Sequence, residues 1–152
     1  MATTADAKVL IVGGGASGLT CALYLARAHV PCVVLDHGKP VLQRACLNNF
    51  PGLPSMKGMD WLASLRTQLS QYEHVCIEDG KVTALTPTAG GFTARLETGA
   101  CRTGTLLVLA SGQAGIEFAT LLGLIPVEGV QPYVKRNLET NHWGETKVPG
   151  AD

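Results

Sequence analysis

The sequence lacks an excess of charge of either sign, because its 12 Lys and Arg residues balance 12 Asp and Glu residues. A nucleic-acid surface needs a basic excess and an acidic tail needs a run of carboxylates, so the composition argues against both. The sequence also lacks an apolar run long enough to cross a membrane, and no apolar core of signal-peptide length precedes residue 9. These absences predict a cytoplasmic protein with neither a nucleic-acid nor a membrane partner.

Paired cysteines are missing as well, because the 5 cysteines are odd in number, widely spaced and form no Cys-x-x-Cys. Zinc knuckles and redox dithiols both need closely spaced cysteines, so the sequence predicts neither. The 4 histidines show no metal-ligand spacing, and we expect no metal site.

Glycine is abundant instead, with 18 residues, and Gly13–Gly18 contains a Gly-x-Gly-x-x-Gly pattern. Four apolar residues, 9–12, precede the pattern and are typical of a strand buried on both faces. Apolar residues at helical spacing follow it, and a second apolar strand, Cys32–Asp36, ends in an acid. A strand, a glycine turn, a helix and a strand in this order are typical of a dinucleotide-binding unit.

Each part of this unit has a physical role in binding a dinucleotide. Gly13 permits the tight turn, Gly15 lets a pyrophosphate approach the backbone, and Gly18 lets the helix pack closely on the sheet. The free N–H groups and the positive dipole end of the helix face the phosphates. Asp36, about 20 residues after the turn, is placed to accept hydrogen bonds from a ribose diol. The predicted contact residues are Gly13, Gly15, Ala16, Ser17, Gly18 and Asp36.

The middle of the chain continues with helical and strand patterns. Residues 58–72 carry apolar side chains at helical spacing, and 75–77 have the pattern of a short strand. Residues 80–104 show alternating segments separated by turn residues, which predict a three-stranded antiparallel β-meander with its last strand at 100–103. A separate, continuous apolar strand follows at 105–110 and suits a buried parallel sheet.

The last part of the chain carries weaker patterns. Residues 115–124 fit a short helix or an extended segment, 133–137 fit a strand, and 141–152 fit a polar loop. A chain of 152 residues is long enough for one domain with a core, and too short for two ordinary ones. We therefore predict one α/β, Rossmann-like domain over residues 1–152, with a parallel sheet, helices on one face, and the meander insertion on the other.

Five separated segments are, together, similar to the motifs of one protein family. They are Gly13–Ala28, the Asn-Phe-Pro-Gly run Asn49–Gly52, Gly58 before a helix, Leu107–Gly112 and the Thr-Lys-Val-Pro-Gly run 146–150. In this combination the chain resembles the thioredoxin-reductase-like, FAD-dependent pyridine nucleotide-disulfide oxidoreductases. The resemblance implies an FAD cofactor, a loop along the flavin, and a further segment that passes the FAD. It adds to the predicted contacts Asn49, Pro51, Gly52, Ala110 and Gly112.

Two features of that family are missing from the sequence. Thioredoxin reductases insert an NADPH domain with a Cys-x-x-Cys after the segment that resembles Leu107–Gly112, and the stretch from there to residue 146 has no room for one. The chain also stops at Asp152, so Ala151-Asp152 is either a vestige of the family's Ala-Ala-Gly-Asp motif or a cut just before it. In both cases the helix that completes the family's FAD site is missing. The resemblance is therefore to a single-domain type with the FAD half alone, and NAD(P)H or a reductase partner is the implied electron donor.

The sequence names no catalytic residue, because no side chain is an obvious acid, base or nucleophile. A speculative candidate is Cys46, whose thiolate would cycle near a flavin, and the competing interpretation is an inert loop cysteine. Two other functions stay open beside that of an FAD-dependent oxidoreductase. The turn could hold NAD or another adenine nucleotide in a sensor module, or the chain could be a non-catalytic truncated flavoprotein that pairs with itself, as a homodimer, or with a partner.

Overall fold

A six-stranded sheet forms the centre of the molecule. The computed structural model describes residues 7–112, 116–129, 134 and 136–151. The strand order is β5-β2-β1-β8-β7-β6, in which the first four strands run parallel and the last three are joined antiparallel. The strands are β1 (Ala7–Val12), β2 (Cys32–Asp36), β5 (Val75–Asp79), β6 (Val82–Thr88), β7 (Gly91–Leu96) and β8 (Cys101–Leu109).

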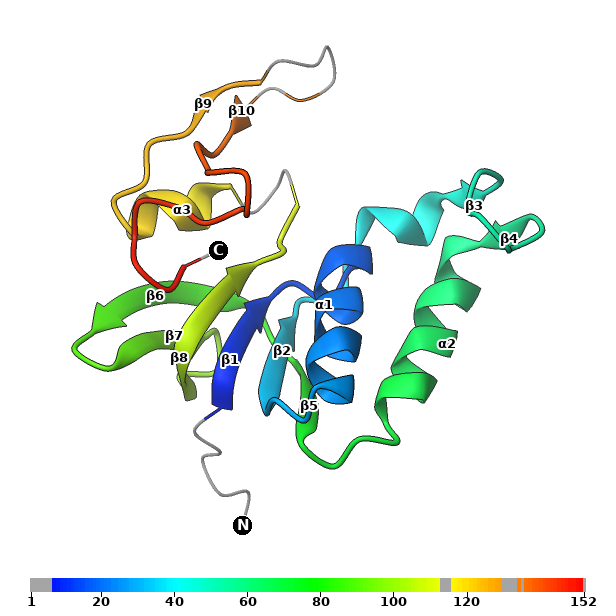
Figure 1. The fold of residues 1–152 in the computed structure, drawn as a ribbon, viewed down its shortest axis with the longest axis horizontal. Coiled ribbons are helices and arrows are strands. Elements are labelled where there is room, and N and C mark those ends of the chain that lie inside the picture. The colour runs from blue at the N-terminus through cyan, green and yellow to red at the C-terminus, as the bar shows by residue number, and fades with distance from the viewer. Residues whose placement is uncertain (1–6, 113–115, 130–133, 135, 152) are drawn as a thin grey trace.

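Two helices cover one face of the parallel strands, as predicted. Helix α1 (Ala16–Arg27) follows β1, and α2 (Gly58–Leu69) precedes β5, three residues shorter than the predicted 58–72. Both are visible on the side of β1 and β2 away from β6 and β7 (Figure 1). Alternate strand residues point to this face because side chains alternate along a strand. The buried core here consists of Val9, Ile11, Leu19, Ala22, Ala26, Cys32, Val34, Leu62, Leu65 and Leu69.

Strand β8 joins the two parts of the sheet. Its residues 101–104 pair antiparallel with β7, and residues 104–109 pair parallel with β1. The separate strands predicted at 100–103 and 105–110 are therefore one strand, and that boundary was wrong. Gly104 lies at the junction, where an added Cβ would stand 2.8 Å from the Cγ of Leu10. The glycine marks a close approach of β8 to β1 and does not end a strand.

The β6–β7 hairpin continues the same sheet beyond β8, and its apolar side chains pack with those on the second face of the parallel strands. Its side chains share a buried core with the opposite set of strand residues; this core includes Leu10, Val12, Val33, Leu35, Val82, Leu85, Phe92, Ala94, Leu96 and Leu107. A bidentate ion pair links β8 to β5. Arg102 donates from Nε to Glu78 Oε2 at 2.6 Å and from Nη2 to Oε1 at 2.8 Å.

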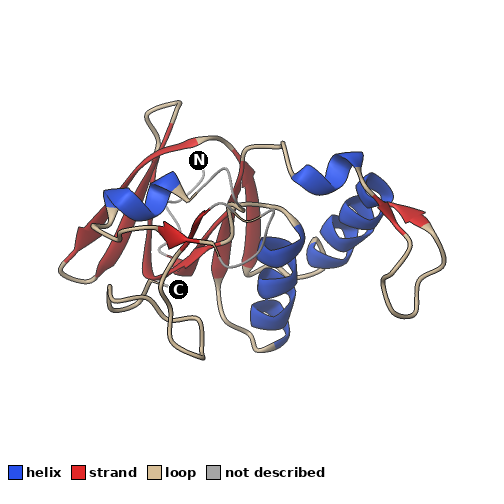
Figure 2. Cartoon of the chain, turned by 90° about the horizontal axis from the view of Figure 1, so that it is seen from above, coloured by secondary structure: helices blue, strands red, loops and turns tan. Residues whose placement is uncertain are grey.

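Short elements complete the fold. The predicted loop 37–56 contains a 3-10 helix, in which the Gln43 N–H donates to the Pro40 carbonyl, and a small antiparallel hairpin of β3 and β4. The C-terminal part, residues 116–151, resolves the open alternative at 115–124 in favour of a helix, α3. Figure 2 shows α3 at the opposite end of the molecule from α2 and the β3–β4 hairpin. The short elements are η1 (Val41–Arg44), β3 (Cys46–Leu47), β4 (Met56–Lys57), α3 (Glu117–Leu121), β9 (Val127–Glu128) and β10 (Arg136–Asn137).

The chain returns to the central sheet near its end. Ala151, in the segment predicted as a polar loop, is fully buried and forms a parallel bridge with Leu107 of β8. The strand predicted at 133–137 is present as β10 at 136–137, and residues 133 and 135 lie outside the described residues. Among the helices of the described part of the chain, none has the length and apolar character needed to cross a bilayer.

Candidate nucleotide-binding site

The glycine turn between β1 and α1 is held tightly against the end of β8. Gly13 has φ of 115°, a conformation that glycine adopts without strain, and its N–H donates to the Leu35 carbonyl at 2.9 Å. An added Cβ on Gly13 would stand 2.6 Å from the carbonyl carbon of Ala110 and 2.9 Å from the Cα of Ser111. The turn that the sequence predicted at Gly13 is therefore present, and only glycine fits it.

Gly18 brings α1 close to the turn. An added Cβ there would overlap the Gly13 carbonyl oxygen, with the Gly13 carbonyl carbon at 3.1 Å and the Ala110 Cβ at 3.3 Å. Gly18 is buried in the third position of α1. The predicted close packing of helix and sheet is confirmed, and its neighbour is the backbone of the turn itself.

Gly14, to which the sequence analysis gave no role, makes room for Asp36. An added Cβ on Gly14 would overlap the carboxyl group of Asp36 and stand 2.5 Å from the Asp36 Cβ. Asp36 ends β2, which pairs with β1 in parallel register, so the two strands deliver the acid and the turn to the same edge of the sheet. The sequence spacing predicted that Asp36 lies near the turn. That position 14 must be glycine is evident only from the structure, in which the Asp36 carboxyl occupies the space of a side chain there.

Asp36 is buried, at 4% exposed, and both carboxylate oxygens have partners. The Gly38 N–H donates to Oδ1 at 3.0 Å, and the Arg66 guanidinium on α2 donates to Oδ2. It is the single buried charged side chain within the described ranges. A buried carboxylate without a cation is costly, so the pair with Arg66 supports its placement here. Arg66 belongs to no motif, and the sequence analysis did not identify it.

The N-terminus of α1 is open toward the same edge. Gly15 is its N-cap, with φ of −82°, and neither a capping side chain nor an acidic residue of the first turn covers it. Ala16 is half-buried and Ser17 is exposed, and the heavy atom nearest an added Cβ on Gly15 would be Pro40 Cβ, at 3.7 Å. Uncapped N–H groups at a helix start, with the positive end of the helix dipole, favour an anion.

A cavity of about 280 Å³ adjoins the turn at the carboxyl end of β8. Ser111 is shared between its lining and the contact to Gly13, so the cavity continues the predicted 110–112 segment. Apolar walls with a few hydroxyl and amide groups are typical of small-molecule sites. The sequence missed four lining residues, Ile116, Asn137, Leu138 and Thr140, because their segments carry no motif. The full lining is Leu109, Ser111, Gly112, Ile116, Asn137, Leu138 and Thr140.

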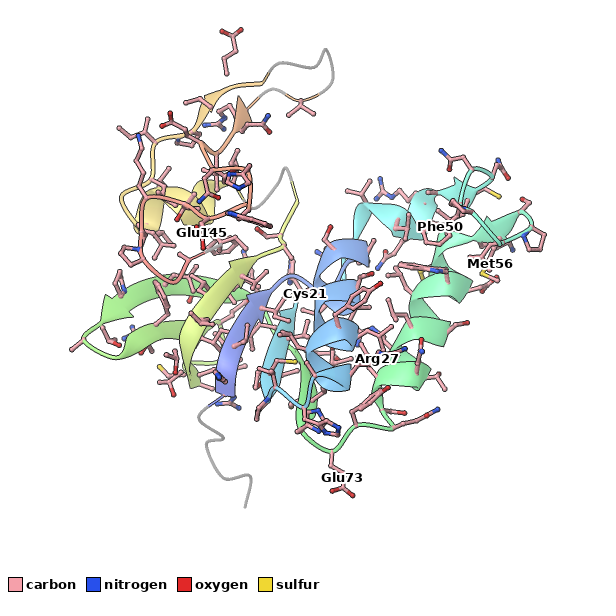
Figure 3. The ribbon with its side chains drawn as sticks, in the orientation of Figure 1. Cys21, Arg27, Phe50, Met56, Glu73 and Glu145 are labelled. Atoms are coloured by element: carbon pink, nitrogen blue, oxygen red, sulfur yellow. The ribbon has the colours of Figure 1, made fainter. Side chains whose placement is uncertain are left out.

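The predicted flavin-side residues Asn49, Pro51 and Gly52 are exposed in the loop between β3 and β4. In Figure 1 this hairpin projects from the body of the molecule, and Figure 3 shows Phe50 and Met56 on it, far from Glu145 in the C-terminal segment. A ring contact between Phe50 and Trp61, with centroids 5.5 Å apart, links the hairpin to α2. The structure does not group these residues with the glycine turn, and their contact with a flavin stays a prediction.

Cys46 lies on the same hairpin and is exposed. Its Sγ is 3.2 Å from the Ser55 hydroxyl and 3.6 Å from Asn48 Oδ1. Two other cysteines are held as thiols: burial raises the pKa of Cys21, and burial together with the neighbouring thiols raises the pKa of Cys32 to about 11. No contact to the candidate site connects Cys46 with it among the described residues, so a redox role for Cys46 stays a hypothesis.

Comparisons with known proteins agree with this geometry. The model of the NAD(P)-binding Rossmann-like domain family matches residues 11–74, which include the turn, Asp36 and Arg66. A ferredoxin–NADP reductase of Granulibacter bethesdensis is 27% identical over 143 residues, covering 86% of this chain and 41% of the relative. A thioredoxin reductase of Claviceps purpurea is 31% identical over 118 residues, covering 74% and 36%. The solved thioredoxin reductase from Gloeobacter violaceus has a TM-score of 0.65 at 34% identity, covering 70% of this chain and 37% of that one.

The sheet, the glycine turn and the acid at the end of β2 define a Rossmann-like nucleotide-binding domain. Over most of its length the chain is similar in sequence and in fold to thioredoxin-reductase-like oxidoreductases. It spans 36–41% of the length of these curated relatives.

Proposed function

We propose that this chain binds FAD, with the ADP half over the glycine turn, and serves as the flavin-carrying part of a thioredoxin-reductase-like oxidoreductase. The observation that carries the proposal is the cradle formed by three glycines whose side-chain space is filled by Ala110, Asp36 and the turn itself. A turn without side chains lets a pyrophosphate approach the backbone, where the uncapped N–H groups at the start of α1 can donate to it. The similarity to thioredoxin and ferredoxin–NADP reductases supports FAD as the ligand.

In this proposal each part of the site has a distinct task. Gly15 and the first N–H groups of α1 bind the pyrophosphate, and Asp36 accepts hydrogen bonds from the adenosine ribose. From β1 the chain continues to β2 and β5 on one side, whereas the later parallel strand β8 lies on the other side of β1. Ligands of open parallel sheets bind at such a switch point, so we expect the ligand to extend between the ends of β1 and β8. The cavity lined by Ser111 and Asn137 lies at that end of β8 and suits a ring with a hydrogen-bonding edge.

The bound flavin supplies the electron-transfer chemistry, and the protein supplies orientation and exclusion of water. The described residues form one nucleotide-binding unit. In this proposal NAD(P)H is the electron donor, and it reaches the flavin directly or through a reductase partner.

A second candidate is a module that binds NAD or another adenine nucleotide without a flavin. The match of residues 11–74 to the NAD(P)-binding Rossmann-like family favours this candidate. The ADP half is common to FAD, NAD and related nucleotides, so the same turn could hold any of them. The turn and Asp36 bind that half in either case.

The visible absorption spectrum of the purified protein tests the proposal, followed by identification of the nucleotide released on denaturation. We expect flavin absorption with FAD released in near 1:1 ratio, or uptake of FAD when a colourless preparation is dialysed against it. Gly14→Ala, which pushes a methyl group into Asp36, should take up much less FAD. The control is Gly90→Ala, because Gly90 has open space around it. Binding of NAD without FAD would establish the second candidate in place of the first.

A further inference from the structure

Arg66 reaches the proposed ribose site from a distant part of the sequence. It lies on α2, whose Leu62, Leu65 and Leu69 are buried against the sheet, so the helix is fixed in place by its apolar face. Long side chains on a helix point back toward its N-terminus, which directs this guanidinium toward the end of β2. There it donates to Asp36 Oδ2. The Arg66 side chain is 34% exposed and the Asp36 side chain 6%, so the acid is the more deeply buried partner of the pair.

The pair leaves acceptor positions on the carboxylate unfilled. An ionised carboxylate offers about four acceptor positions on its two oxygens. Gly38 N–H occupies one position on Oδ1 and Arg66 one on Oδ2, so each oxygen keeps acceptor capacity for a hydroxyl group. The Asp36 carboxyl also fills the space that a side chain at Gly14 would occupy, so it packs against the glycine turn. Its orientation is therefore fixed from three sides.

We propose that Arg66 is a positioning residue that holds the Asp36 carboxylate ready for an unmodified ribose diol, and so sets the preference of the site for a ribose without a 2′-phosphate. The inference rests on the proposed function. An arginine near this acid can serve a 2′-phosphate in NADP-binding domains, but here the guanidinium is bound by the acid itself. A 2′-phosphate would face the Asp36 carboxylate at the same position, and like charges repel.

The test compares the binding of ADP, 2′-deoxy-ADP and adenosine 2′,5′-bisphosphate by calorimetry. The unchanged protein should bind ADP about 10-fold more tightly than 2′-deoxy-ADP, because one hydrogen bond to a charged acceptor is lost. Arg66→Gln should reduce this ratio to about 3-fold or less, since the acid is no longer held, whereas Arg66→Lys should keep most of it. Arg27→Gln, at an exposed position in the last turn of α1 (Figure 3), is the matched control and should keep the full ratio.

A second variant separates positioning from folding. In an Asp36→Asn background the ratio should already be lost, and adding Arg66→Gln should change it no further, while this double variant avoids an unpaired buried charge. An unchanged ADP to 2′-deoxy-ADP ratio in Arg66→Gln would overturn this inference alone. Tighter binding of the 2′,5′-bisphosphate than of ADP by the unchanged protein would also overturn it, because Arg66 would then be a phosphate ligand. Failure of the unchanged protein to bind ADP or FAD would overturn the proposed function as well.

Discussion

Replacing Gly18 by alanine sets two physical effects against each other. Gly18 is the third residue of α1, and alanine is the better helix former at such a position by about 1 kcal/mol. The new methyl group, however, would overlap the Gly13 carbonyl oxygen and lie 3.1 Å from its carbon. Backbone atoms cannot rotate away as a side chain can, so either α1 or the glycine turn must move.

The overlap should dominate. Forcing extra volume into a packed region lowers the free energy of unfolding by about 1–3 kcal/mol. Because the methyl group of Gly18→Ala would meet backbone atoms, we expect a loss at the upper end of this range, about 3 kcal/mol. Subtracting the gain of about 1 kcal/mol in helix propensity leaves a net loss of about 2 kcal/mol in the free energy of unfolding. For a chain of this size each kcal/mol lowers Tm by about 2–4 °C, so Tm should fall by about 4–8 °C.

Thermal unfolding followed by circular dichroism measures this change directly. Gly90→Ala serves as the control, because its added Cβ meets nothing within 4 Å, and its Tm should stay close to that of the unchanged protein. A Tm of Gly18→Ala equal to or above that of the unchanged protein would show that helix propensity decides the outcome. The tight packing of α1 on the glycine turn would then be refuted.

Three further predictions concern the core and the cysteines. Arg102→Ala removes the bidentate pair with Glu78 and should lower the free energy of unfolding by about 1 kcal/mol in urea titration; a double-mutant cycle without coupling between these two positions would contradict the ion pair. Leu69→Ala should cost about 2–5 kcal/mol because Leu69 is fully buried, and a loss well below this range would mean that α2 is not packed as described. Burial raises the pKa of Cys32 from 9.0 to about 11, so the folded state holds this proton more tightly than the unfolded chain does. The resulting stabilisation is complete below pH 9.0 and is lost as the pH rises toward 11; urea titrations across this range should show a smaller fall in Cys32→Ala, and equal falls would contradict the shift.

Local patterns in the sequence were sufficient for the elements around the glycine turn. The apolar strand, the turn at Gly13 and the close packing at Gly18 depend on neighbouring residues, so their spacing already predicts them. The helices and the β-meander followed from periodicity for the same reason. One boundary that failed was at Gly104, where a glycine that permits the close approach of Leu10 lies between residues 101–103 and 105–109 without ending the strand.

Contacts between residues far apart in the chain could not be predicted from local sequence patterns. Arg66 pairs with an acid 30 residues away on another element, and a single arginine on an amphipathic helix has the same pattern as any solvated charge. Gly14 is required only because Asp36 occupies the space beside it. The cavity residues Asn137 and Thr140 join the site through the path of the C-terminal segment, which no periodicity encodes.

The most direct test of the central claim is a competition between FAD and ADP for the unchanged protein, followed by flavin fluorescence. The account predicts that one FAD binds per chain and that ADP displaces it competitively, because the ADP half occupies the glycine turn beside Asp36. Uptake of FAD that ADP does not displace, or no uptake of FAD at all, would contradict the assignment of this turn as the FAD site.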